Sequence, residues 1–328
     1  MRSSLLLTVL ATVGSSTASP LLVKKANFDP PPGADIDILN YALTLEFLER
    51  KFYQEGLANY TEQDFCNAGF EASFYNNLMS IYADEQDHVT FLATALGAKA
   101  VQEATYSFPS TDVKSFVALS AILEGVGVSA YLGAAGAIAN KAYLTAAGSI
   151  LTVEARHAAY VRAALGEAPF PKPMDTPLDF NAVFSLAAQF ITGFAPGAAP
   201  LPFKAFPPLT LQPSQYPYTE GSSSVTFSNA YANAMSAGLA TKDTAVYAVF
   251  YSGLNVYYVQ TYVTQGGKDY KIQKLPGAND TSSGELPPLG QTYVVLSTAN
   301  GQGNNTVSDE NTISGVGVLE VLPNGTSN

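Results

Sequence analysis

The two histidines of this 328-residue sequence are each preceded, three positions earlier, by a glutamate. The resulting motifs are Glu85-x-x-His88 and Glu154-x-x-His157. On an α-helix, residues three apart lie on one face, so each motif presents a carboxylate and an imidazole together. Two such helices, with one inward glutamate from each of two more helices, form a dinuclear metal site inside a four-helix bundle.

Two further glutamates, Glu46 and Glu124, occupy the places that such a site requires. Tyr53 follows Glu46 by seven residues, and Tyr131 follows Glu124 by seven. The order of a glutamate, a tyrosine two turns later and then Glu-x-x-His therefore occurs twice, which predicts two similar helical hairpins. The two tyrosines are interpreted either as redox-active or hydrogen-bonding groups near the metals, or as packing residues of the core.

The predicted ligands are four carboxylates and two imidazoles. They are Glu46, Glu85, His88, Glu124, Glu154 and His157. These donors suit two iron or manganese ions, with zinc as a competitor. Without metal, several acids in an apolar bundle would each cost several kcal/mol or take up protons. Glu49 lies one turn from Glu46 and remains an alternative, although the spacing to Tyr53 favours Glu46.

Four predicted helices must position these side chains, one for each part of the ligand set. They span about Asp35–Leu57, Phe70–Leu96, Asp112–Ala139 and Lys141–Leu165. Asp35 or Asp37 is the expected cap of the first helix, and Thr111 or Asp112 that of the third. The polar segment Asn59–Asn67 is expected to be a connection.

The third helix is apolar enough to suggest a membrane span, but three features oppose that interpretation. Glu124 would cost about 3 kcal/mol near the bilayer centre. The run is rich in Gly, Ala and Ser, which suits close helix contacts, and no positively charged flank marks a cytoplasmic side. Each interior glycine costs about 1 kcal/mol relative to alanine. Something must offset that cost, and the usual cause is a neighbouring backbone or ligand that needs the space.

The pattern changes after the fourth helix, where four prolines occur between residues 169 and 177. Leu178–Phe194 is expected to be a shorter fifth helix, and residues 195–220 a proline-rich linker. Residues 221–328 contain six runs rich in Val, Tyr and Thr, separated by turn residues, which is typical of a small all-β sandwich. The runs are Ser224–Phe227, Ala245–Tyr251, Asn255–Val263, Tyr270–Ile272, Gln291–Ser297 and Gly317–Leu322. No catalytic constellation is evident in this region.

The N-terminus predicts secretion. Arg2 precedes an apolar run and small residues, so residues 1–19 are interpreted as a signal peptide. Residues 20–34 form an N-terminal extension and a candidate pro-segment, because Lys24-Lys25 offers a dibasic processing site. Four N-glycosylation sequons agree with an extracellular or cell-wall location. They begin at Asn59, Asn279, Asn304 and Asn324.

The net charge and the cysteine count limit which partners and cross-links the chain can have. The net charge of −11 argues against nucleic-acid binding, which requires clustered Lys and Arg. Cys66 is the sole cysteine, so no internal disulfide can form. The oligomeric state is not predicted.

The motifs together resemble the ferritin-like superfamily, and most of all the secreted fungal stress-response and plant desiccation-related proteins with a ferritin-like domain. The resemblance covers about residues 36–165 and rests on the stretches NYALTLEFLERKFYQEGL, YADEQDHVTFL, LEGVGVSAYLGA and VEARHAAYV. It implies a four-helix bundle with a dinuclear carboxylate site at the six predicted ligands. Together with the β-rich runs, we expect an α+β multidomain chain whose helical bundle spans residues 35–194. The resemblance also implies that residues 98–111 cross over between two hairpins, and it associates the chain with stress and desiccation.

Two functions fit this interpretation. In the first, a di-iron or di-manganese oxidoreductase acts on peroxide, dioxygen or ferrous iron, so that its partner is a small oxidant or a metal ion. In the second, the chain is a non-catalytic cell-surface glycoprotein. Metal then only stabilises the bundle or is sequestered by it. The β-domain would then bind a cell-wall or surface partner.

Overall fold

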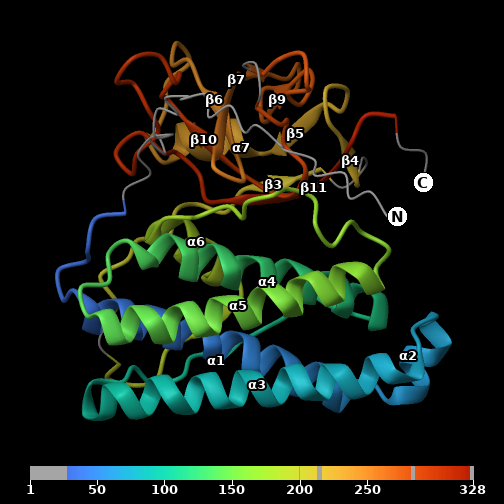
Figure 1. The fold of residues 1–328 in the computed structure, drawn as a ribbon. Coiled ribbons are helices and arrows are strands. Elements are labelled where there is room, and N and C mark those ends of the chain that lie inside the picture. Colours follow the sequence, from blue (N-terminus) through green and yellow to red (C-terminus); the bar gives the residue numbers. More distant parts are fainter. Residues whose placement is uncertain (1–27, 199, 213–215, 282–284, 326–328) are drawn as a thin grey trace, which may run out of the picture.

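The computed structural model describes residues 28–198, 200–212, 216–281 and 285–325, which form a helical bundle and a β-rich layer (Figure 1). The predicted α+β class is therefore confirmed. The predicted signal peptide (residues 1–19) and residues 20–27 of the predicted extension, with Lys24-Lys25, lie outside the described residues.

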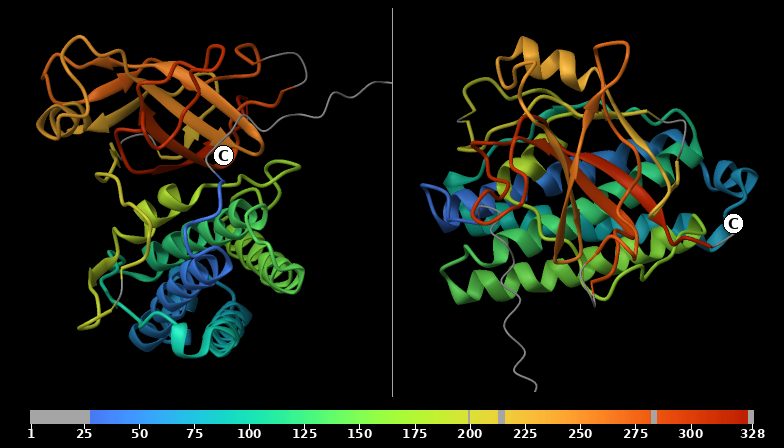
Figure 2. Two further views of the ribbon diagram at one scale, coloured as in Figure 1. Left: turned by 90° about the vertical axis from the view of Figure 1, so that its left-hand side faces the viewer. Right: turned by 90° about the horizontal axis from the view of Figure 1, so that it is seen from above.

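Four long helices build the bundle as two hairpins. They are α1 (Asp35–Asn59), α3 (Ala72–Leu96), α4 (Val113–Ala135) and α5 (Lys141–Ala164). Helix α1 packs along α3, and α4 packs along α5 (Figures 1 and 2). The chain leaves α3 through the short 3₁₀ helix η1 (Gly97–Lys99), and the Asn40 side chain on α1 bonds the Lys99 carbonyl and the Val101 amide. All four predicted helices are present, with α4 ending four residues earlier than expected.

Two segments differ from the sequence-based expectation. The connection after α1 contains a short helix, α2 (Glu62–Ala68), which a capping box between Thr61 and Asp64 starts. The predicted fifth helix is shorter, because α6 spans only Phe180–Ala187 and the chain then turns. Ile191–Gly193 forms strand β2, which pairs with β1 (Thr105–Tyr106). The β-branched pair Ile191-Thr192, followed by glycine, favours this extended conformation over helix.

The helix caps agree with the prediction at α4 and differ at α1. Asp112 caps α4 by accepting from the Ser115 amide, and Ser115 bonds back in a capping box. At α1, Ala34 is the N-cap and no side chain caps the helix. Asp35 instead accepts from the amides of Ala139 and Asn140. This carboxylate therefore ties the start of α1 to the loop between α4 and α5.

Helix α4 is long and apolar enough to cross a membrane by composition, yet 72 % of its most apolar stretch is buried inside the protein. Its buried side chains contact the other helices on one side and the β-rich layer on the other. The all-round apolar pattern is thus the pattern of a central core helix.

The glycines of α4 lie where neighbours approach closely, as the sequence analysis required. A Cβ at Gly125 would lie 2.4 Å from the Gln291 side chain. A Cβ at Gly133 would lie 1.8 Å from the Leu178 carbonyl oxygen, which is backbone and cannot rotate away. The absence of side chains therefore lets the following segments pack directly on the helix.

The β-rich layer contains two sheets. The five-stranded sheet has the order β4-β11-β10-β6-β7, and the four-stranded sheet the order β3-β5-β9-β8. The strands are β3 (Thr210–Leu211), β4 (Tyr218–Thr219), β5 (Val225–Ser228), β6 (Tyr247–Ser252), β7 (Asn255–Gln260), β8 (Tyr262–Val263), β9 (Tyr270–Ile272), β10 (Gly290–Ser297) and β11 (Gly317–Leu322). All six predicted runs form strands; β3 and β4 lie in the proline-rich segment, and a helix, α7 (Ala230–Ser236), was not predicted.

The five-stranded sheet is buried on both faces. Along β10, Val294 and Leu296 pack into the core shared with the four-stranded sheet. The alternate residues Tyr293 and Val295 belong to the core of the helical bundle. Because side chains alternate along a strand, one sheet completes two apolar cores. The two sheets therefore form the expected sandwich, and the bundle covers its outer face (Figure 2).

A buried ion pair joins the bundle to this sheet. The Arg162 guanidinium on α5 makes two hydrogen bonds, of 2.8 and 2.7 Å, to the Glu320 carboxylate on β11. Both residues are buried, and Arg162 also bonds the Ala168 carbonyl. Removing Arg162 would leave the buried Glu320 charge without its partner, so this contact helps to fix how bundle and sheet meet.

The close approach at Gly133 yields a stability prediction. Gly133→Ala should destabilise the protein by at least about 2 kcal/mol, because the new Cβ meets the Leu178 carbonyl. The matched control is Gly148→Ala in the middle of α5, where a Cβ would meet nothing within 4 Å. That change should stabilise the protein by about 1 kcal/mol. Urea unfolding followed by far-UV circular dichroism measures both, and equal effects would contradict the packing described here.

Candidate metal centre

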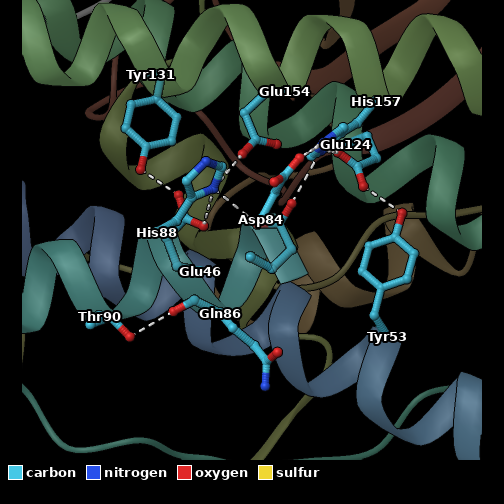
Figure 3. A network of polar contacts seen from close by, with 11 residues as sticks. Glu46, Tyr53, Asp84, Gln86, His88, Thr90, Glu124, Tyr131, Glu154 and His157 are labelled. Atoms are coloured by element: carbon cyan, nitrogen blue, oxygen red, sulfur yellow. Dashed lines mark hydrogen bonds and ion pairs between the residues drawn. The ribbon is translucent and has the colours of Figure 1, made fainter. Parts of the chain in front are cut away.

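The structure brings the six predicted ligands together in the interior of the bundle. Glu46 comes from α1, Glu124 from α4, and the two Glu-x-x-His motifs from α3 and α5 (Figure 3). The four glutamates are 0 to 1 % exposed, and the two histidines are 7 to 9 % exposed. Such burial of ionisable groups is rare unless they are paired or bind metal.

The donor atoms fall into two groups that share two carboxylates. In the first group, Glu46, Glu85, His88 and Glu154 each offer one donor atom within 4.8 Å of the others. In the second group, Glu85, Glu124, Glu154 and His157 do the same. Glu85 and Glu154 therefore stand between the two groups. Each group adds its own histidine and its own outer glutamate.

Both histidines direct Nδ1 at carboxylates. His88 Nδ1 lies 3.2 Å from Glu46 Oε2, 3.3 Å from Glu85 Oε2 and 3.4 Å from Glu154 Oε1. His157 Nδ1 lies 3.2 Å from Glu85 Oε1 and 3.3 Å from Glu124 Oε2. The two imidazoles thus occupy equivalent positions, as the repeated sequence pattern predicts.

Each tyrosine of the repeat donates a hydrogen bond to the outer glutamate of the opposite hairpin. Tyr131 on α4 bonds Glu46 on α1, while Tyr53 on α1 bonds Glu124 on α4 (Figure 3). Ser120, one turn before Glu124, also bonds the Tyr53 hydroxyl. Of the two interpretations of these tyrosines, hydrogen bonding beside the cluster agrees with the geometry. Both rings are also buried in the core.

The Nε2 atom of His157 has a partner on the neighbouring hairpin. It lies 3.1 Å from Asp84 Oδ2, and the Asp84 side chain is 52 % exposed. A carboxylate there fixes the ring orientation and leaves Nδ1 free to face the cluster. Asp84 thus serves His157, on the other hairpin, rather than His88, which is nearer to it in the sequence. Asp87 is exposed.

Glu49 is a fifth buried acid beside the cluster. It is 4 % exposed, its Oε2 has no hydrogen-bond partner among the described residues, and it belongs to neither donor group. A Cβ at Gly127 would lie 2.7 Å from Glu154 Oε2 and 3.1 Å from Glu49 Oε1, so both carboxyl groups lie against the backbone of Gly127. Between the two alternatives on α1, the structure thus places Glu46 with the histidines and Glu49 at the edge.

Crowded carboxyl groups hold protons more strongly than usual. Burial, with smaller contributions from nearby acids, raises the pKa of Glu85 to about 7, even though both histidines oppose the shift. Burial and the charge of Glu85 raise the pKa of Glu154 far above its ordinary value. Burial alone lowers the pKa of His157, but the carboxylates of Glu124 and Glu85 outweigh it and raise the pKa to about 11.

Several donor atoms nevertheless lack a hydrogen-bond partner among the described residues. They are Glu85 Oε1, Glu124 Oε2, both carboxylate oxygens of Glu154, and His157 Nδ1. A buried polar atom without a partner costs about 1 to 3 kcal/mol. These atoms face one another at contact distances without hydrogen-bond geometry, which is the arrangement of ligands around a common cation. The residues present therefore fit a metal centre.

The comparisons with known proteins agree with this arrangement. Residues 34–167 match the family model described as a ferritin-like domain. The chain is also 25 % identical over 197 residues to the protein named rds1 from Schizosaccharomyces pombe, a match that covers 60 % of this chain. The match spans 49 % of the length of that relative. Together with the two hairpins and the buried carboxylate and histidine cluster, these matches identify residues 34–167 as a ferritin-like domain.

Proposed function

We propose that the cluster binds two iron or manganese ions and that the protein is an oxidoreductase acting on peroxide, dioxygen or ferrous iron. The observation that carries the proposal is the set of two donor groups sharing Glu85 and Glu154. These two glutamates would contribute donor atoms to both sides of the centre. Glu46 with His88, and Glu124 with His157, would complete the two sides. Bound iron or manganese supplies reversible one-electron redox chemistry at this position.

Charge balance supports two divalent ions. The four carboxylates of the two groups carry four negative charges when ionised, which two divalent cations neutralise. The hydrogen bonds from Tyr53 and Tyr131 orient the outer glutamates and hold protons beside them. An apolar core surrounds the cluster and limits the access of bulk water. The hydrogen bonds and this packing would hold the ligands in place during turnover of a small oxidant.

The proposal includes a secreted glycoprotein with a role in stress or desiccation. Each of the four sequon asparagines is exposed, so a glycan at Asn59, Asn279, Asn304 or Asn324 would meet no core residue. The predicted signal peptide would direct the chain to the extracellular space or the cell wall. This location matches the family resemblance of the helical motifs.

A second candidate function is a non-catalytic surface protein in which metal only stabilises the bundle or is sequestered. The observation that favours it is the number of buried donors without partners, because binding metal there would itself contribute to folding stability. In this case the β-domain would bind a cell-wall or surface partner. Metal content and turnover distinguish the two functions.

Replacing one outer glutamate tests the centre directly. Glu124→Gln keeps the shape of the side chain but removes its charge, so the metal content should fall from two ions to about one per chain. Turnover of peroxide or ferrous iron should fall at least about 100-fold. Glu62→Gln, at an exposed position on α2, is the control and should change neither value. Elemental analysis and single-turnover assays measure both. Full metal content without turnover in the wild type would favour the second function.

The tyrosine pairs give a finer prediction. Tyr53→Phe removes the hydrogen bond to Glu124, and Tyr131→Phe removes the bond to Glu46. Each substitution should therefore lower the affinity for one of the two ions about 10-fold. Tyr41→Phe is the matched control, because the buried Tyr41 hydroxyl has no hydrogen-bond partner among the described residues. Metal titrations that resolve two binding steps measure the effect. Unchanged affinity in both variants would exclude the orienting role.

Protonation predicts how the stability of the metal-free protein depends on pH. Glu85 holds its proton up to about pH 7 in the folded chain but loses it near 4.5 in the unfolded chain. The raised pKa of His157 acts in the same direction above 6.5. The folded state therefore binds more protons, and the free energy of unfolding should fall by on the order of 3 kcal/mol between pH 5 and pH 8.

Bound metal should reverse this trend, because metal displaces those protons and binds more tightly as the pH rises. Urea unfolding at pH 5.5, 6.5 and 7.5, with a chelator or with added Mn²⁺, measures both series. A metal-free protein that is more stable at pH 7.5 than at pH 5.5 would contradict the prediction that the folded cluster binds more protons than the unfolded chain.

A further inference from the structure

A cavity of about 560 Å³ lies between the helical bundle and the β-rich layer, outside the donor groups. Helices α1, α4 and α6 form one wall, with Leu48, Leu119 and Leu186 among their lining residues. Strands β3 and β11 form the opposite wall, which includes Leu211 and Val318. The cavity therefore exists only because the two parts of the chain meet here.

The inner end of the cavity borders the candidate metal centre. Gly127 and Glu49 both line it, and a Cβ at Gly127 would lie 2.7 Å from Glu154 Oε2. The absence of a side chain at residue 127 leaves the carboxyl groups of Glu49 and Glu154 near the cavity. Any larger residue at this position would collide with the Glu154 carboxylate.

The residues that line the cavity favour a neutral ligand over an anion. Most of the described lining residues are aliphatic or aromatic, and none is Lys, Arg or His. Glu49 is the acid among them, and 4 % of its surface stays accessible. An anion would thus be buried without a counter-ion, which is costly. A neutral molecule with one donor would satisfy Glu49 instead.

We propose that this cavity binds a neutral, mainly apolar organic molecule that donates one N–H or O–H hydrogen bond to Glu49. Its volume lies within the range of small-molecule sites, about 300 to 1,000 Å³, which suits a two- or three-ring compound. The occupant lies beside the cluster, with Gly127 between them. This inference goes beyond the proposed function and does not require bound metal.

Two dyes with the same aromatic skeleton test the proposal on the intact, metal-free chain. N-Phenyl-1-naphthylamine is neutral and has one N–H donor, whereas 8-anilinonaphthalene-1-sulfonate adds an anionic sulfonate. The neutral dye should bind in the micromolar range, and the sulfonate at least about 10-fold more weakly. Fluorescence titration measures both, and equal affinities would overturn the proposal.

Substitutions locate the binding site. Leu119→Trp fills the cavity from α4, and Val318→Trp fills it from β11, so either should weaken the neutral dye at least about 10-fold. Met79→Trp on the exposed face of α3 is the matched control and should leave binding within about twofold. Far-UV circular dichroism identifies the cavity variants that fold. Wild-type affinity in a folded cavity variant would contradict the proposal.

The donor contact has its own variant. Glu49→Leu removes the acceptor while keeping an apolar side chain, so the neutral dye should bind several-fold more weakly. Glu124→Gln, which should abolish turnover, should leave dye binding unchanged. If the wild type binds the dye but shows no turnover, the proposed function alone fails. Turnover without dye binding would support the proposed metal centre and contradict the proposal that the cavity binds a ligand.

Discussion

The burial of ionisable groups in an apolar bundle is the constraint on which the structure depends. Five carboxyl groups and two imidazoles lie at the meeting point of α1, α3, α4 and α5, with little solvent exposure. Isolated charges there would cost several kcal/mol each, so the chain must pair, protonate or metallate them. The histidines pair some of them, and the raised pKa values of Glu85 and Glu154 favour the neutral, protonated form of others. The donors that remain without partners are those that a cation would satisfy.

The approximate two-fold arrangement follows from this constraint. Each hairpin contributes an outer glutamate, a tyrosine and a Glu-x-x-His motif, and each tyrosine bonds the glutamate of the other hairpin. A hairpin alone would leave its acids without these donors, because the tyrosine that serves Glu46 comes from α4. The duplicated pattern thus makes the two halves mutually dependent. Glu49 has no counterpart in this exchange, which agrees with its position at the edge of the cluster.

The sequence predicted the elements whose signals are local or repeated. The four long helices follow from apolar periodicity and caps, and the six strands from β-branched and aromatic runs between turn residues. The ligand set could be predicted because both histidines follow the same motif. Helix α2 was missed although its capping box is a local signal, because it has only seven residues in a polar segment. Strand β2 was missed because it depends on pairing with β1, a partner 85 residues away along the chain. The contact between Asp84 and His157 and the position of Glu49 depend on how helices rotate against one another, which spacing alone does not determine.

The β-rich layer explains why α4 has the composition of a membrane span. In an isolated four-helix bundle, the outer face of α4 would meet water and carry polar residues. Here the five-stranded sheet covers that face, and Tyr293 on β10 bonds both the Gly125 carbonyl and the Ser129 hydroxyl of α4. The helix therefore needs apolar residues around most of its circumference and glycine where Gln291 and Leu178 approach. The same covering creates the cavity beside Gly127, because a twisted sheet cannot follow a straight helix along its whole length. One packing choice thus accounts for the unusual composition of α4, for its glycines and for the space next to the candidate centre.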